Sequence, residues 1–270
     1  MRGVSRASLA EIEEQLEPLT VSSQAAGTLA EELFGVAGLL ATQPVLRRAL
    51  ADPSRAGAQR SALARSLLTG KVSQETADLV AATAAGRWSA PGDLTDAFEQ
   101  LAVQALVAAA EHEGHLDDLE DELFRFGRIV ASQPALRMAL TNPFISGGAK
   151  RQLLNHLLAD KVTPESLRLI TEAAVSPLGR GLDLSLEEYA RLAARRRARL
   201  VAEVHVTVAL TAAQRRRLAA ALAETYGHEV YLNVVLDPRV VGGMTVRVGD
   251  ELIDASVATR LAEARRKMAS

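Results

Sequence analysis

The sequence has no cysteine, few aromatic residues and no excess of either charge. Of its 270 residues 3% are aromatic, and 31 Lys and Arg against 33 Asp and Glu give a formal net charge of −2. Without cysteine the chain forms no disulfide, no thiolate zinc site and no cysteine nucleophile. The balanced charge provides no overall basic field that would concentrate the chain on nucleic acid or on anionic lipid.

Long apolar segments are also missing from the sequence pattern. Residues 1–18 carry acids where a secretory signal needs an apolar region, and we find no run of about 18 apolar residues. We therefore expect a soluble chain whose link to any membrane is indirect. With 48% hydrophobic residues and roughly 100–200 residues per domain, the length predicts two or three domains.

An internal repeat occupies the first two thirds of the chain. Positions from about 32 to 84 match positions ninety residues later, among them Gln43-Pro44 with Gln133-Pro134 and Lys71-Val72 with Lys161-Val162. The matches fall on apolar and helix-breaking positions, so both copies should share one helical layout. The sequence predicts a small helical domain that is present twice.

Prolines and caps mark the expected helices. Short helices are predicted over residues 45–50 and 135–140, Ser73 and Thr163 are predicted N-caps, and a long helix is predicted over residues 94–113. Another helix is expected to open at a capping box formed by Ser185 and Glu188. We expect two tandem helical-bundle domains, residues 1–93 and 94–182.

The periodicity changes from about residue 201. Alternating apolar residues predict a strand over 201–210, Thr211 should cap a helix that ends near Tyr226, and strands are expected over 230–236 and 244–248. A turn at residues 249–250 and a last helix over 256–268 complete the pattern. Residues 183–270 thus comprise a linking helix and a small α+β domain, and the fold class is mainly α.

No motif for catalysis or nucleotide binding is evident. The glycine-containing segments lack the spacing of a phosphate-binding loop. His112 and His115 stand among acids and could form a metal site, but Gly114 interrupts the helix between them, and a solvated helix-turn-helix is the simpler interpretation. We expect no catalytic residue, no metal and no cofactor; a metal-dependent hydrolase at these histidines is one alternative.

Two arginine clusters give a second alternative. They are Arg195-Arg196-Arg197 with Arg199, and Arg215-Arg216-Arg217. A nucleic-acid-binding regulator would use such helices, but no aromatic residue is interleaved with the arginines. A solvated basic face, or one paired with an acidic partner helix, is the simpler interpretation, so we expect no nucleic-acid partner.

The C-terminal segment resembles a known family signature. The signature positions are Asp237, Gly242, Gly243, Gly249, Asp254 and Ser256. Together with the surrounding apolar strands they resemble the delta subunit of F-type ATP synthases, the family of the oligomycin sensitivity-conferring protein. Ala255 stands where this family usually has glycine. An ordinary member is about ninety residues shorter, so residues 1–93 look like an extra copy of its helical domain.

The resemblance implies a non-catalytic stator subunit. In this family the helical domain holds the N-terminal helices of alpha subunits and the C-terminal domain holds the b subunit, which keeps the head from turning with the rotor. The chain would be peripheral, on the cytoplasmic face of the cell membrane, with no direct membrane insertion and no small-molecule substrate. The role of the extra copy stays open.

Partner-contacting residues are expected on two-faced helices. For the alpha-binding groove they are Val103, Leu106, Val107, Leu167, Ile170 and Ala174 in the second copy, and Leu79 and Val80 in the first. For the b-binding face they are Val257, Leu261 and Met268. Core packing is the alternative for each of them. Gly242, Gly243, Asp254 and Ser256 are expected to shape the backbone, and Asp254 or Ser256 to cap the last helix.

Overall fold

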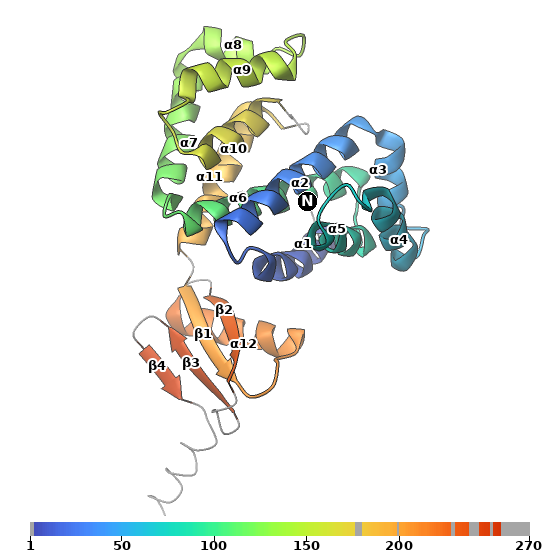
Figure 1. The fold of residues 1–270 in the computed structure, drawn as a ribbon, viewed down its shortest axis with the longest axis vertical. Helices are drawn as coiled ribbons and strands as arrows, with labels where there is room; N and C mark the ends of the chain where they lie inside the picture. The colour runs from blue at the N-terminus through green and yellow to red at the C-terminus, as the bar shows by residue number, and fades with distance from the viewer. Residues whose placement is uncertain are drawn as a thin grey trace, which may run out of the picture. The chain divides into compact units, whose positions relative to one another are not determined.

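The computed structural model describes residues 3–175, 180–198, 200–227, 230–237, 243–248 and 251–254. Within them the chain is mainly α-helical with a small sheet toward the C-terminus, as the sequence predicts (Figure 1). It divides into two compact units, Met1–Arg196 and Arg197–Ser270. The first unit holds both copies of the repeat, and independent folding of each copy stays a prediction.

The helices of the first unit begin where the sequence offers a start signal. Proline lies in the first turn of α3, α6 and α8, where its missing N–H removes no helical hydrogen bond. The side chains of Ser22, Ser73 and Ser146 accept hydrogen bonds from backbone amides at the starts of α2, α5 and α9. The elements are α1 Gly3–Leu16, the 3-10 helix η1 Glu17–Leu19, α2 Ser23–Thr42, α3 Pro44–Ala51, α4 Gly57–Leu68, α5 Gln74–Ala85, α6 Pro91–His112, α7 Leu116–Ser132, α8 Pro134–Thr141, α9 Gly147–Leu158, α10 Pro164–Val175 and α11 Leu182–Ala198.

The two copies repeat one layout of helices. Helices α3 and α4 recur as α8 and α9 with both ends displaced by ninety residues. The predicted caps are confirmed, because the Ser73 and Thr163 hydroxyl oxygens accept hydrogen bonds from the Thr76 and Ser166 amides.

A carboxylate from the second helix of each copy supports these caps. Glu32 accepts hydrogen bonds from the Ser73 amide at 2.8 Å and the Ser73 hydroxyl at 2.6 Å. Glu122 accepts the corresponding pair from Thr163, both at 2.9 Å. Burial alone would raise the pKa of Glu32, but the hydrogen bonds from Ser73 and Thr76 lower it, so the carboxylate is stabilised in its ionised form.

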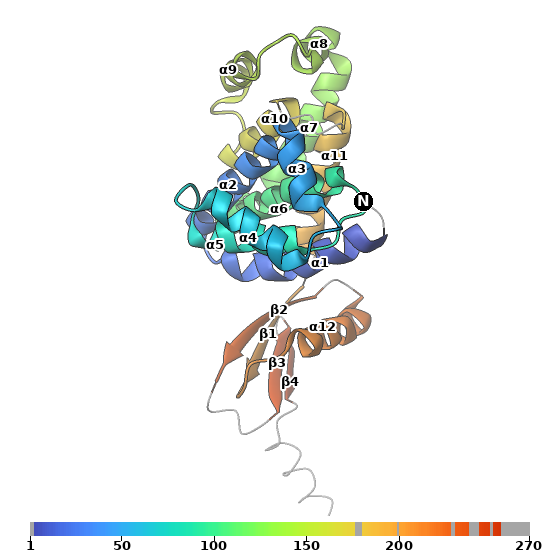
Figure 2. The ribbon, with the colours of Figure 1, turned by 90° about the vertical axis from the view of Figure 1, so that its right-hand side faces the viewer.

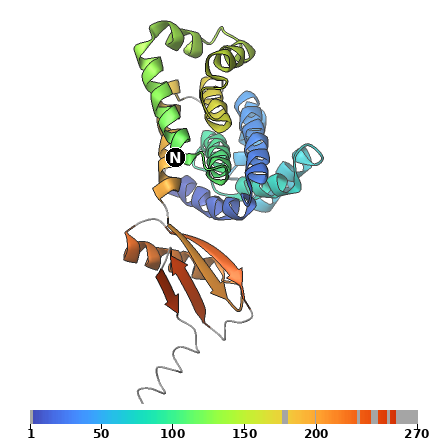
Figure 3. The same cartoon turned by 60° about the vertical axis from the view of Figure 1, so that its left-hand side comes forward.

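Helix α6 is the central helix of the first unit. It packs against α1, α2, α3, α5, α7 and α10 (Figure 3), and Leu94, Phe98 and Leu101 are fully buried. In the ninety-residue register, α1 corresponds to residues 93–106 and α11 to residues 92–108. Helix α6 therefore stands both as the last helix of the first copy and as the first helix of the second.

The predicted capping box at Ser185 is wrong. Helix α11 begins at Leu182, and the Ser185 amide already donates a hydrogen bond to the Gly181 carbonyl at 3.1 Å. Ser185 is therefore a buried residue of the first turns. The Ser-x-x-Glu spacing occurs inside helices as well as at their starts, so the spacing alone does not locate the cap.

Helix α2 is long and apolar enough, by length and composition, to cross a bilayer. Its buried residues, including Leu29, Leu33 and Leu40, contribute to the hydrophobic core of the first unit. A core helix meets the same criterion, and the packing of α2 against α6 accounts for its composition.

The described residues of the second unit form a four-stranded sheet with helix α12 against a face (Figure 2). Its elements are β1 Leu200–Val206, α12 Ala212–Tyr226, β2 Val230–Leu236, β3 Met244–Val248 and β4 Glu251–Asp254. The strand order is β2-β1-β3-β4, in which β1 and β2 are parallel and the other pairs antiparallel. A parallel pair needs a crossover connection, and α12 provides it.

The predicted alternation in β1 is confirmed over a shorter range. Ala202, Val204 and Val206 are buried with Leu222 of α12 in the core of this unit, but the strand ends at Val206. The predicted cap at Thr211 is confirmed and forms a capping box with Gln214, and Gly227 ends α12 with a left-handed backbone.

The signature residues lie partly in the described region. The Asp237 amide donates to the Val206 carbonyl at 2.9 Å, and Gly243 has a φ of 79°, a conformation that favours glycine. Asp254 ends β4. Gly242, Gly249, Ser256 and the predicted last helix lie outside the described residues.

Candidate functional site

Most of the expected partner-contacting residues lie in the hydrophobic core. Buried residues are Val103, Leu106, Val107, Ile170, Ala174, Leu79 and Val80, and Leu167 is half-buried. Core packing, the alternative interpretation, accounts for this burial, and contact with a partner through these residues stays a prediction. Val257, Leu261 and Met268 lie outside the described residues.

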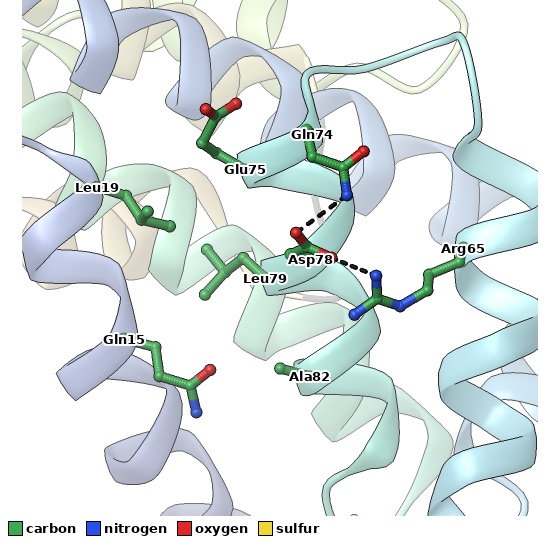
Figure 4. A pocket seen from close by; sticks show the side chains of 8 residues that line it. All are labelled: Gln15, Leu19, Arg65, Gln74, Glu75, Asp78, Leu79 and Ala82. Carbon is green, nitrogen blue, oxygen red and sulfur yellow. Dashed lines mark hydrogen bonds and ion pairs between the residues drawn. The ribbon is translucent and has the colours of Figure 1, made fainter. Parts of the chain in front are cut away.

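An open groove lies on the first copy, between α1 and α5. We call it the α1–α5 groove; its volume is about 420 Å³. Leu19 and Ala82 are half-buried beside the buried Leu79, whereas Gln15 and Glu75 are exposed. An apolar floor with a polar rim is the arrangement that receives an amphipathic helix. The lining residues come from α1, η1, α4 and α5 and are Gln15, Leu19, Arg65, Gln74, Glu75, Asp78, Leu79 and Ala82 (Figure 4).

Asp78 is the central charge of this rim. Its carboxylate pairs with Arg65 and accepts a hydrogen bond from the Gln74 amide nitrogen at 3.0 Å (Figure 4). The Arg65 and Asp78 side chains are 52% and 48% exposed, so water screens the pair and it contributes little stability. A partner can therefore replace Arg65 beside Asp78 at low cost.

At the equivalent surface of the second copy, α2 of this chain pairs with α10. We call this surface, formed by the residues ninety positions later, the α6–α10 groove; α2 packs against α6 beside it (Figure 3). Arg168 of α10 pairs with Glu31 of α2, with 2.8 Å between its Nη2 and Oε2 of Glu31. The same guanidinium lies 5.1 Å from the centre of the Phe34 ring, a cation–π distance. The equivalent residues are Ala105, Ala109, Asn155, Pro164, Glu165, Arg168, Leu169 and Glu172.

A buried polar cluster joins α6 to α11. Glu99 is 4% exposed and accepts hydrogen bonds from the Tyr189 hydroxyl and from Nη2 of Arg180, each at 2.5 Å. Burial raises the pKa of the Glu99 carboxyl, against the opposing effect of Tyr189 and Arg180. Burial also raises the pKa of the Tyr189 phenol, which keeps its proton. The cluster fixes α11 against the central helix.

Glu99→Gln is expected to flatten the pH dependence of stability. The pKa of folded Glu99 lies above the ordinary value of 4.5, so its contribution to stability is fully present below that value and is lost as the pH rises through the raised pKa. Glutamine does not ionise, so the stability of the variant relative to the original chain should increase as the pH rises above 4.5. Urea unfolding at several pH values measures this, with Glu75→Gln at the exposed rim as the control. Parallel pH profiles for E99Q and the original chain would contradict the prediction.

Comparison with known proteins identifies the family. The family model "ATP synthase delta (OSCP) subunit" matches residues 102–268. The ATP synthase subunit delta of Streptomyces griseus is 47% identical over 270 residues, with 100% of each chain covered. Those of Thermobifida fusca and Acidothermus cellulolyticus are 46% and 44% identical, again with 100% of each chain covered. This chain belongs to the ATP synthase delta (OSCP) subunit family.

The membership confirms the resemblance predicted from the signature. It makes the chain a structural component of the peripheral stalk of an F-type ATP synthase. The alignments cover the whole of this chain and of these delta-family relatives, so the relatives share the added helical copy. A chain from the Toxoplasma gondii mitochondrial ATP synthase hexamer also matches, at 19% identity and a TM-score of 0.27 over 62% of this chain and 95% of that chain, a likeness too low to support an argument.

Some residues of each alternative from the sequence have partners within this chain. His112 lies 2.6 Å from the Thr20 carbonyl, and His115 lies 3.2 Å from Glu165; no group of metal-binding side chains occurs among the described residues. Arg196 is largely buried between Glu17 and Glu111, at 2.9 and 2.6 Å. In this delta-family chain that arginine joins α11 to the first copy.

Asp78 was not found from the sequence, although a signal for it was present. In the alignment of the copies, Asp78 stands opposite Arg168 among otherwise similar residues. A charge of opposite sign at one position of a repeat indicates that the two copies contact different neighbours. Glu99 gave no such signal, because its partners Arg180 and Tyr189 are 81 and 90 residues away.

Proposed function

We propose that this chain is the stator connector of its ATP synthase. It holds the N-terminal helices of the alpha subunits at its helical unit and the b subunit at its C-terminal unit, and it prevents the catalytic head from turning with the rotor. In this role it has no catalytic residue and binds no cofactor, nucleic acid or small-molecule substrate. It lies on the cytoplasmic face of the membrane, held there through the complex.

The α1–α5 groove is the observation that carries the proposal. It offers an apolar floor beside Leu19 and Leu79 and a polar rim at Asp78, which suits an amphipathic helix from a partner. A connector also has to transmit force between its contacts. The central position of α6, buried along most of its length, supports a stiff helical unit, because close-packed interiors resist compression.

Reconstitution of the synthase tests the proposal. We expect vesicles containing the synthase without this chain to hydrolyse ATP but to make little ATP from a proton gradient, because an unfastened head turns with the rotor. Adding the full chain should restore synthesis. The hydrolysis rate in the same vesicles is the control for an intact head. Full proton-driven synthesis in the absence of the chain would overturn the proposal.

A further inference from the structure

A charge network attaches the end of α11 to the first copy of the repeat. We call it the Arg196 junction; it consists of Arg196 of α11, Glu17 of η1 and Glu111 of α6. Nη1 and Nη2 of Arg196 donate to the two carboxylate oxygens of Glu17 at 3.1 and 2.9 Å, and Nε donates to Glu111 at 2.6 Å. The side chains of Arg196 and Glu17 are 9% and 15% exposed, so salt screens this pair little. The two hydrogen bonds to Glu17 fix the orientation of the guanidinium as well as its position.

The turn that carries Glu17 is itself held in place. The amide and the hydroxyl of Thr20 donate to the Glu17 carbonyl at 3.1 and 2.9 Å, and Pro18 restricts the first turn of η1. Nε2 of His112 lies 2.6 Å from the Thr20 carbonyl oxygen. Since a carbonyl only accepts, the imidazole donates this hydrogen bond. The turn is therefore attached to the end of α6, next to Glu111.

The layout that the two copies share does not account for the junction. Ninety residues from Glu17 and Arg196 stand Val107 and Leu106, and both are buried apolar residues of α6. The charged pair is therefore not inherited from the repeated fold. It lies where the first copy meets α11, and Arg196 is the last residue of the first unit.

The chemistry of the contact indicates what it does. A buried ion pair often adds no more stability than apolar packing of similar volume, so stability alone does not explain why charges replace the apolar residues of the repeat. Apolar packing is non-directional, whereas a guanidinium with two parallel bonds to one carboxylate has a single favourable orientation. The junction thus sets the direction of the helix end immediately before the second unit, Arg197–Ser270.

We propose that the first copy, which is the extra one, anchors the end of α11: Glu17 holds Arg196, so that a force reaching the end of this helix is shared by both copies. The inference rests on the proposed function, in which the chain transmits force between its partners. Without residues 1–93, Arg196 would have Glu111 but not Glu17. Arg196 and Glu17 are thus positioning residues, and the added copy stiffens the connector where the helical unit ends.

Hydrogen exchange of the full chain tests the anchor. Glu17→Gln keeps the shape of the side chain but removes its charge, so the helix end should open more easily. We expect protection of the amides of residues 193–196 to fall about tenfold, which corresponds to about 1.4 kcal/mol and is reasonable for the loss of charged hydrogen bonds. Glu188→Gln is the matched control, because it neutralises a glutamate that pairs with Arg191 within α11. It should leave the same amides unchanged.

Two further variants test the geometry of the network. Arg196→Gln removes the cation and leaves the carboxylates of Glu17 and Glu111 at one place, so protection should fall further than in E17Q. In the double variant E17Q/R196Q one of these two charges is gone, so protection should recover above that of R196Q. Unchanged protection in E17Q, an equal loss in E188Q, or a double variant no better protected than R196Q would overturn the anchor.

ATP synthesis in reconstituted vesicles tests the consequence for force. Vesicles with E17Q should make ATP more slowly than vesicles with E188Q at the same proton gradient, because an unanchored helix end yields under load; equal rates would overturn this role of the junction. The original chain distinguishes the two proposals. If it restores synthesis while E17Q keeps full protection, only the anchor fails. If it does not restore synthesis while E17Q loses protection, the proposed function fails and the anchor is supported.

Discussion

Arg60→Met is expected to lower the free energy of unfolding of the first unit by about 3–5 kcal/mol, because several buried carbonyls lose a charged donor at once. Arg60 is 5% exposed. Its guanidinium donates to the carbonyls of Ala84, Ala85 and Gly86 at the end of α5, at 2.7–2.9 Å. Two further bonds reach the carbonyls of residues 52 and 55, at 2.9 and 2.8 Å. Methionine fills similar space but leaves these buried acceptors without donors.

The repeat supplies a matched control for this variant. Lys150 occupies the equivalent position and donates one described hydrogen bond, to the Ala174 carbonyl at 3.3 Å. Lys150→Met should cost about 1–2 kcal/mol, because one bond from a charged donor is lost. The loss of stability in Arg60→Lys should lie between those of R60M and K150M. Urea unfolding followed by circular dichroism measures all three, and an R60M chain as stable as K150M would contradict the assignment.

Phe98→Ala is expected to lower the free energy of unfolding by about 3–5 kcal/mol and to reduce hydrogen-exchange protection in both copies. Phe98 is fully buried, and removing its ring from a close-packed core leaves a cavity. Because α6 packs against helices of both copies, the cavity should lower hydrogen-exchange protection in α2 and in α10 to a similar extent.

Leu154→Ala provides the contrast. Leu154 is fully buried in α9, which packs against α10, so its truncation should reduce protection mainly in the second copy. Truncation of a buried leucine lowers the free energy of unfolding by about 2–5 kcal/mol. The two variants should therefore lose similar stability, but the loss of protection should extend over both copies in F98A and over one copy in L154A. Loss of protection confined to one copy in F98A would show that α6 does not couple the copies.

Local signals were sufficient for much of the fold. The helices at residues 44–51 and 134–141, the caps at Ser73 and Thr163 and the capping box at Thr211 are set by neighbouring residues, and the sequence predicts all of them. Ser185 misled the prediction, because a capping-box spacing is common and the backbone bond to Gly181 is not visible in it.

The site was less predictable, because it depends on contacts between the copies. Periodicity located the buried stripes of α6 and α10, including Val103 and Ile170, but an apolar stripe has the same pattern whether it packs against a partner or against its own chain. The pairing of Arg168 with Glu31 spans 137 residues. No local rule anticipates a contact of that separation, and it is this contact that joins α2 to α10 of the second copy.

The position of α2 limits the valency of the helical unit. Helix α2 is joined to the α6–α10 groove by the chain itself, so it acts as a tethered ligand whose effective concentration is on the order of millimolar. A free helix present at micromolar concentration would have to bind that groove about a thousandfold more tightly than α2 to displace it half of the time. Duplicating the domain therefore does not double the number of open grooves among the described residues, because α2 pairs with the second one through Glu31 and Arg168. Under the proposed function, we expect one partner helix for each helical unit.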